Sequence, residues 1–151
     1  MAKKSKNLQY YESVGRRKEA VARVRLYIVG KEKTVTVNEN KIKAGEVYIN
    51  NKPAEKTFSK IDEKITYLKA LQLTNNENRF AVSILVKGGG KNGQLESVAL
   101  GIARAIEKSD KEQYRPILKK QRLLTRDSRT RERRKIGTGG KARRAKQSPK
   151  R

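Results

Sequence analysis

The chain has 151 residues, of which 39 are Lys or Arg and 15 are Asp or Glu, so its formal net charge is +24. A positive field this strong attracts polyanions, and nucleic acid is the usual one. The chain has no cysteine and no histidine, which excludes disulfide frameworks, thiol catalysis and histidine-based acid–base or metal chemistry. No apolar run approaches the roughly 18 residues of a membrane span, and no apolar signal core follows the basic N-terminus, so we expect a cytoplasmic protein.

Alternating apolar residues predict strands in the first half of the chain. We expect strands at residues 8–14 and 20–29, and shorter ones at 35–37 and 47–49. In the second of these, Arg23, Arg25 and Tyr27 should face away from the core. The side chains expected to face it are Ala22, Val24, Leu26 and Ile28.

Helical spacing takes over in the second half. Ile61, Ile65, Leu68 and Leu71 predict a helix, with Ser59 as its cap. Residues 80–86 read as a strand, and residues 94–108 as a helix with a full apolar stripe. A strip of small residues on that helix, Ser97, Gly101 and Ala105, predicts close packing against the sheet. The fold class is therefore α+β, a single small α/β domain with a mixed sheet and a long basic C-terminal tail.

Composition divides the chain. Residues 111–151 hold 17 Lys or Arg, 3 acids and 8 apolar residues, too few to bury a core of their own. We expect a basic N-terminal arm at residues 1–7, a globular RNA-binding domain at 8–110, and a basic C-terminal extension and tail at 111–151. The tail has a single aromatic residue, Tyr114, so backbone and shape recognition of structured RNA fits it better than base stacking.

A glycine-rich turn, Gly88 to Gly93, lies between the strand at 80–86 and the helix at 94–108 and fits the pattern G-x-G-x-x-G. A dinucleotide site would need a buried strand after the helix, and residues 110–116 are not one. A Walker loop would need Lys and Ser or Thr where Gln94 and Leu95 stand. Two interpretations stay open: a phosphate meets the backbone and the helix N-terminus beside Lys87 and Lys91, or the turn only feeds the helix.

Three motifs, in order along the chain, resemble the family of small-subunit ribosomal protein nine. They are residues 10–24 (YYESVGRRKEAVARV), residues 88–94 (GGGKNGQ) with the helix that follows, and residues 118–135 around LTRDSR. Residues 141–144 and the closing Lys150 and Arg151 resemble the family's tail. The chain departs from the family in an expanded region at residues 30–45 and at Lys146, Ser148 and Pro149.

The resemblance implies a left-handed β-α-β crossover, a place in the head of the small ribosomal subunit among neighbouring head proteins, and binding to small-subunit ribosomal RNA. It also implies that Lys150 and Arg151 contact the anticodon stem of the tRNA in the peptidyl site. No enzymatic activity, metal, cofactor, membrane or small-molecule substrate is expected. The residues expected to bind ribosomal RNA are Arg16, Arg17, Lys18, Lys87, Gly88, Gly89, Gly90, Lys91, Lys119, Lys120, Arg122, Arg126, Arg129, Arg131, Arg133, Arg134, Lys135, Lys141, Arg143, Arg144 and Lys146.

Three other classes remain as alternatives. The first is the RNA-binding subunit of another ribonucleoprotein, such as a processing ribozyme, which shares the fold. The second is a small-molecule kinase with a glycine-rich loop before a helix, although 151 residues leave no room for its second domain. The third is a DNA-compacting protein, which would explain the tail but not the glycine-rich turn.

Overall fold

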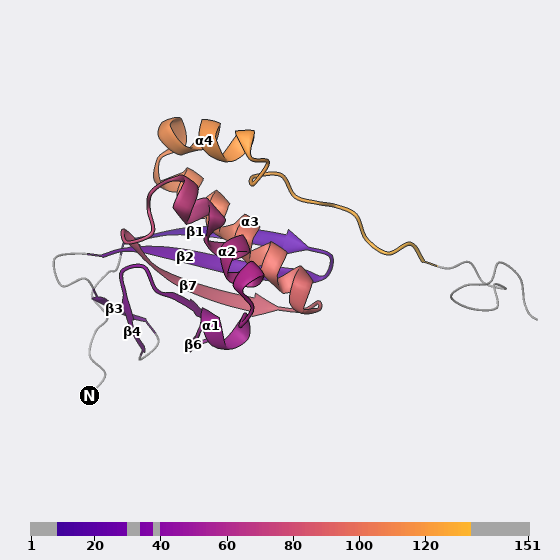
Figure 1. Ribbon diagram of the computed structural model, residues 1–151, viewed down its shortest axis with the longest axis horizontal. Coiled ribbons are helices and arrows are strands. Elements are labelled where there is room, and N and C mark those ends of the chain that lie inside the picture. Colours follow the sequence, from indigo (N-terminus) through magenta and orange to yellow (C-terminus); the bar gives the residue numbers. More distant parts are fainter. Residues whose placement is uncertain (1–8, 30–33, 38–39, 134–151) are drawn as a thin grey trace, which may run out of the picture.

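The computed structural model describes residues 9–29, 34–37 and 40–133, which form a five-stranded sheet, a separate two-stranded hairpin and a layer of helices on one face of the sheet (Figure 1). The strand order in the main sheet is β1-β2-β7-β5-β6, and β3 pairs with β4. The elements in chain order are β1 (Tyr10–Arg17), β2 (Ala20–Ile28), β3 (Thr34–Val37), β4 (Asn40–Lys43), β5 (Val47–Ile49), β6 (Lys52–Pro53), α1 (Ala54–Thr57), α2 (Ile61–Leu73), β7 (Phe80–Lys87), α3 (Lys91–Ser109) and α4 (Lys111–Lys120).

The sheet is mixed. β1, β2 and β7 are antiparallel neighbours, whereas β5 runs parallel to β7. The chain between these two parallel strands includes α2, so β5, α2 and β7 form a β-α-β unit. The predicted α+β class with a mixed sheet is confirmed.

The main core lies between the sheet and α3. Ala22, Val24 and Leu26 of β2 are fully buried there, as predicted. β1 and α3 come together at two glycines: a Cβ on Gly15 would overlap the carbonyl oxygen of Ser97, and a Cβ on Gly101 would stand 2.6 Å from Cγ2 of Val24. Ser13 Oγ donates a buried hydrogen bond of 2.5 Å to the carbonyl oxygen of Gly101. The small-residue strip therefore packs against the sheet, as expected.

A second, smaller core lies on the opposite face of the sheet. Tyr27 and Ala81 are buried there beneath Val35 and Ile42 of the β3–β4 hairpin. The alternation of β2 puts both side chains on the faces expected, but Ile28 is 40% exposed at the end of the strand, and Tyr27, which faces away from the main core, is only 4% exposed. The reason is that the hairpin, built from the expanded region at residues 30–45, gives the outer face of the sheet an apolar cover.

α2 forms where predicted, and Leu68 and Leu71 of its predicted stripe pack in the main core, but the two isoleucines do not. Ile61 and Ile65 are 78% and 53% exposed, while Tyr67, Ala70 and Leu71 are buried. The helix begins after Lys60, whose backbone N–H donates to the Glu63 carboxylate at 3.2 Å, so Ser59 is not the cap. Both differences follow from packing against α3, which outweighs the local spacing of the isoleucines.

α4 is a helix that was not predicted from the sequence. The Asp110 side chain caps it by accepting a 3.0 Å hydrogen bond from the backbone N–H of Gln113. Tyr114 and Leu118 are buried in the main core, and Leu123 and Leu124 pack against it after the helix ends. The start of the predicted C-terminal extension thus contacts the globular domain.

Candidate nucleic-acid interface

Two turns that are far apart in sequence meet at one end of the sheet. Arg16 of β1 and Lys87 of β7 both lie directly opposite Val21 of β2, on either side of it. The β1–β2 turn at Lys18 and Glu19 is therefore beside the glycine-rich turn that joins β7 to α3 (Figure 1). The sequence read residues 15–19 as a connection, but β1 continues to Arg17 because Gly15 and Arg17 face α3.

Two glycines of the glycine-rich turn are needed by its geometry. Gly88 and Gly89 have φ of 74° and 64°, and a Cβ on either would come within 3 Å of the β1–β2 turn, at Glu19 O or Ala20 N. Gly90 differs, since it has φ of −94° and no heavy atom lies within 4 Å of where its Cβ would be. Space is therefore open in front of Gly90, at the N-terminus of α3, where no side chain caps the helix.

The helix-free face of the sheet carries exposed cations at this same end. Arg16, Lys18 and Lys87 are exposed, and none of them joins an ion pair within the described ranges. Arg23 is exposed beside them, between Val14 and Leu85 in the strand register, and it was missed as a binding candidate. The signal was available, because the alternation of β2 already turned Arg23 away from the core.

Two of the predicted contact residues are engaged inside the protein. The Arg17 side chain is only 11% exposed and lies against α3 and the C-terminal segment. Lys91 Nζ lies 2.9 Å from Oε1 of Glu63, and its hydrogen bond lowers the pKa of that carboxyl. Of the two lysines that flank the glycine-rich turn, Lys91 is therefore paired, whereas Lys87 has no ion-pair partner among the described residues.

The C-terminal segment begins at the same end of the sheet. Arg16, Arg17, Arg122 and Asp127 line one shallow hollow, so the segment after α4 reaches the end of β1. Lys119 and Lys120 are exposed at the end of α4, and Arg122 follows with a left-handed φ of 55°. The exposed arginines of the extended segment that follows are Arg126, Arg129, Arg131 and Arg133. The candidates outside the described residues are Arg134, Lys135, Lys141, Arg143, Arg144, Lys146, Lys150 and Arg151.

The architecture disfavours the nucleotide-binding alternatives. α3 leads into α4 rather than into a parallel strand, so the glycine-rich turn is not part of a dinucleotide-binding unit. No cluster of acidic residues within the described part of the chain could hold a metal ion. Among the helices of the same residues, none is long and apolar enough to cross a lipid bilayer.

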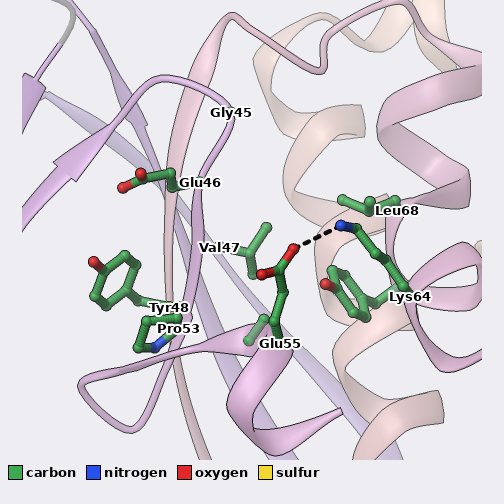
Figure 2. Close-up of a pocket in the computed structure, with 10 residues that line it drawn as sticks. Gly45, Glu46, Val47, Tyr48, Pro53, Glu55, Lys64 and Leu68 are labelled. Carbon is green, nitrogen blue, oxygen red and sulfur yellow. Dashed lines mark hydrogen bonds and ion pairs between the residues drawn. The ribbon is translucent and has the colours of Figure 1, made fainter. Parts of the chain in front are cut away.

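A pocket of about 270 Å³ lies away from the basic end, between β5, α1 and α2 (Figure 2). Its mouth is spanned by an ion pair in which Lys64 Nζ lies 2.6 Å from Oε1 of Glu55. That hydrogen bond lowers the pKa of Glu55 and raises that of Lys64, so both groups stay charged and paired. None of the predicted binding residues lines this pocket.

Comparisons with known proteins identify the family. Residues 15–151 match the family model described as ribosomal protein S9/S16. The chain is 42% identical to "Small ribosomal subunit protein uS9" of Dehalococcoides mccartyi over 142 residues, 94% of this chain and 96% of that protein. Proteins of the same name from Solidesulfovibrio magneticus and Chlorobium luteolum are 41% and 42% identical, covering 87% and 83% of this chain and 90% and 86% of their own lengths. The chain therefore belongs to the ribosomal protein S9/S16 family, as a structural and non-enzymatic constituent of the small ribosomal subunit in the cytoplasm.

Proposed function

We propose that the basic end of the sheet and the C-terminal extension bind small-subunit ribosomal RNA in the head of the subunit. The domain at residues 8–110 presents this end, and the extension at residues 111–151 runs along the RNA from it. The observation that carries the proposal is the convergence of the β1–β2 turn, the glycine-rich turn and the segment after α4 at one end of the sheet. The match to relatives named as small-subunit proteins supports ribosomal RNA over the RNA of a processing ribozyme.

Charge and exposure explain what kind of contact is made. Among the residues that the structure describes, Arg16, Arg23 and Lys87 have no ion-pair partner, and the side chains next to them in the sheet, Val21 and Leu85, are aliphatic rather than aromatic. Such a surface offers no aromatic ring for stacking on splayed bases at this end of the sheet, so neutralising backbone phosphates and releasing counterions is its main mode of contact. Gly90 adds an uncapped helix N-terminus with room for a phosphate oxygen.

Filter binding to a transcript of the head domain of small-subunit ribosomal RNA, at several salt concentrations, tests this interface. Arg16→Ala, Arg23→Ala and Lys87→Ala should each reduce the slope of log affinity against log salt by about one. The matched control is Lys41→Ala, which removes one exposed cation from β4 at the opposite end of the sheet. Equal effects of all four variants would mean diffuse attraction and no interface at this end.

We propose further that the last two residues, Lys150 and Arg151, contact the tRNA in the peptidyl site. The proposal rests on the motif match at the chain's end and on the family, since both residues lie outside the described part. Cations bound to phosphates do not read base sequence, so the contact should not discriminate among tRNAs. The test is tRNA binding to small subunits reconstituted with full-length protein or with protein lacking both residues.

A further inference from the structure

We infer that Arg17 is a positioning residue that fixes where the C-terminal tail leaves the domain before any RNA is bound. The inference rests on the proposed function for its purpose, but its structural content stands without RNA. Arg17 is the last residue of β1 and faces the helix layer, in contrast to its exposed neighbour Arg16. A buried guanidinium persists only where it is paired and hydrogen-bonded, so its partners show what it is held for.

Each nitrogen of the Arg17 guanidinium has a different partner. Nε donates to the Glu96 carboxylate on α3, and Nη2 lies 3.1 Å from Oδ2 of Asp127. Nη1 donates to the backbone carbonyl oxygen of Arg129 at 2.5 Å. The planar guanidinium thus joins β1 and α3 to two points on the segment beyond α4, a geometry that a lysine ammonium cannot reproduce.

The segment held by Arg17 is itself ordered around Asp127. The backbone N–H of Arg129 donates to Oδ1 of Asp127 at 3.0 Å, and Nη2 of Arg129 lies 2.7 Å from Oδ2. These hydrogen bonds lower the pKa of Asp127 well below its usual range and keep it anionic. Leu123 and Leu124, just upstream of Asp127, pack on the main core. The segment is therefore attached to the domain at two points, at these leucines and at Asp127.

Repulsion between like charges would by itself move this segment away from the domain. Between Gln113 and Arg131, Asp127 is the only acidic residue, and the domain surface nearby carries Arg16, Lys18 and Lys87. Like charges at that density repel, and Asp127 is the acid of the segment itself that offsets this repulsion, beside Glu96 of α3, which also attracts Arg129. A tail that leaves from a fixed point loses less entropy on binding, which raises its affinity for an RNA that the domain already contacts.

Spin labels measure the attachment in the full chain. Because the chain has no cysteine, Lys69→Cys on α2 and Thr130→Cys beyond the attachment give a unique label pair. Electron–electron distance measurements without RNA should give one narrow distribution in the parent. Asp127→Asn, a change at a partly exposed and nearly isosteric side chain, should broaden it without changing the melting temperature, and Arg17→Met should do the same. Glu55→Gln, which removes an unrelated surface carboxylate, should leave it narrow.

RNA affinity gives a second measurement. Its expected change has one sign if Asp127 acts only through its charge and the opposite sign if it positions the tail. Removing the negative charge of Asp127 should strengthen RNA binding if charge alone matters, whereas loss of positioning should weaken it by about fivefold. A narrow distribution in Asp127→Asn, or tighter RNA binding by it, would overturn the inference. If the parent gives a narrow distribution but binds no ribosomal RNA, the proposed function fails while the attachment stands.

Discussion

Among Gly→Ala substitutions at the closely packed glycines of the domain, Gly15→Ala should cause the largest loss of stability. Gly15 lies where β1 crosses α3, and its new Cβ would overlap the Ser97 carbonyl oxygen and stand 2.6 Å from the Gly101 nitrogen. Both are backbone atoms, so no rotamer change relieves the overlap and the strand must move away from the helix.

The magnitude follows from what that movement breaks. Overpacking at a close-packed contact costs about 1–3 kcal/mol. Separating β1 from α3 also lengthens the buried Ser13–Gly101 hydrogen bond, a loss of about 1 kcal/mol. The expected loss is therefore about 2–4 kcal/mol of the roughly 5–15 kcal/mol that a domain has. For a chain of this length each kcal/mol lowers the melting temperature by about 2–4 °C.

Urea unfolding followed by far-UV circular dichroism measures the loss, with two comparisons in parallel. Gly101→Ala gains helix propensity of about 1 kcal/mol but meets Cγ2 of Val24, a side-chain methyl. Val24→Ala removes that methyl, so it should rescue part of Gly101→Ala by at least about 0.5 kcal/mol and none of Gly15→Ala. A Gly15→Ala protein within about 0.5 kcal/mol of the parent would refute the close approach of β1 and α3.

Three further predictions concern the turn, the attachment of the tail and the chain's end. Gly90→Val should weaken binding to ribosomal RNA more than it lowers the melting temperature, whereas Gly89→Ala should chiefly lower the melting temperature, because Gly89, unlike Gly90, has a left-handed φ and a neighbour within 3 Å. Thermal melts beside filter binding check this, and unchanged RNA affinity in Gly90→Val would leave the turn a purely structural role. The Asp127 carboxyl should titrate well below its ordinary pKa of about 4, because Arg129 donates to its charged form. Its contribution to the attachment is complete above the ordinary Asp range and is lost as the pH falls through the lowered pKa; an NMR titration with a midpoint near 4 would contradict the pairing. Deleting Lys150 and Arg151 should leave subunit assembly intact and weaken peptidyl-site tRNA binding by about 1–3 kcal/mol, less at high salt. Unchanged tRNA affinity at low salt would exclude the contact, with Lys146, Ser148 and Pro149 as the first residues to examine.

The elements that the sequence predicts best are those that bury a regular set of residues against the helix layer. β2 and β7 bury the residues that alternate on their helix side, and α3 buries a stripe, so each leaves a clear period in the sequence. The close packing at Gly101 could also be inferred, because a glycine in the middle of a helix lowers helix stability and is kept where a larger side chain would not fit.

Where a neighbour decides which face is buried, the local pattern misleads. Ile61 and Ile65 give α2 a helical period, yet both are exposed, while Tyr67, which packs against Phe58, and Ala70 are buried. In α4, Pro116 reads as a helix breaker. Pro116 lacks the N–H that would donate to the backbone carbonyl of Glu112, an exposed residue. The helix tolerates this loss because Tyr114 and Leu118 pack it against the core.

The binding surface could be predicted by charge but not residue by residue. Arg16 and Arg17 are adjacent arginines in one motif, and only the strand's alternation, which puts Arg16 on the outer face and Arg17 under α3, separates their roles. That alternation was hidden because Gly15 reads as the start of a turn. Asp127, the one acidic residue between Gln113 and Arg131, was the available signal that the C-terminal segment touches the domain.

The central position of β7 sets when this protein can fold during its own synthesis. β7 pairs with β2 on one side and β5 on the other, yet it follows the end of β2 by about fifty residues. At about 5–20 residues per second, the β1–β2 hairpin waits roughly 3–10 s for β7, and Val24 and Leu26 stay uncovered until α3 follows. A two-stranded hairpin is marginal in water, so nascent chains should gain protease resistance only after α3 has emerged.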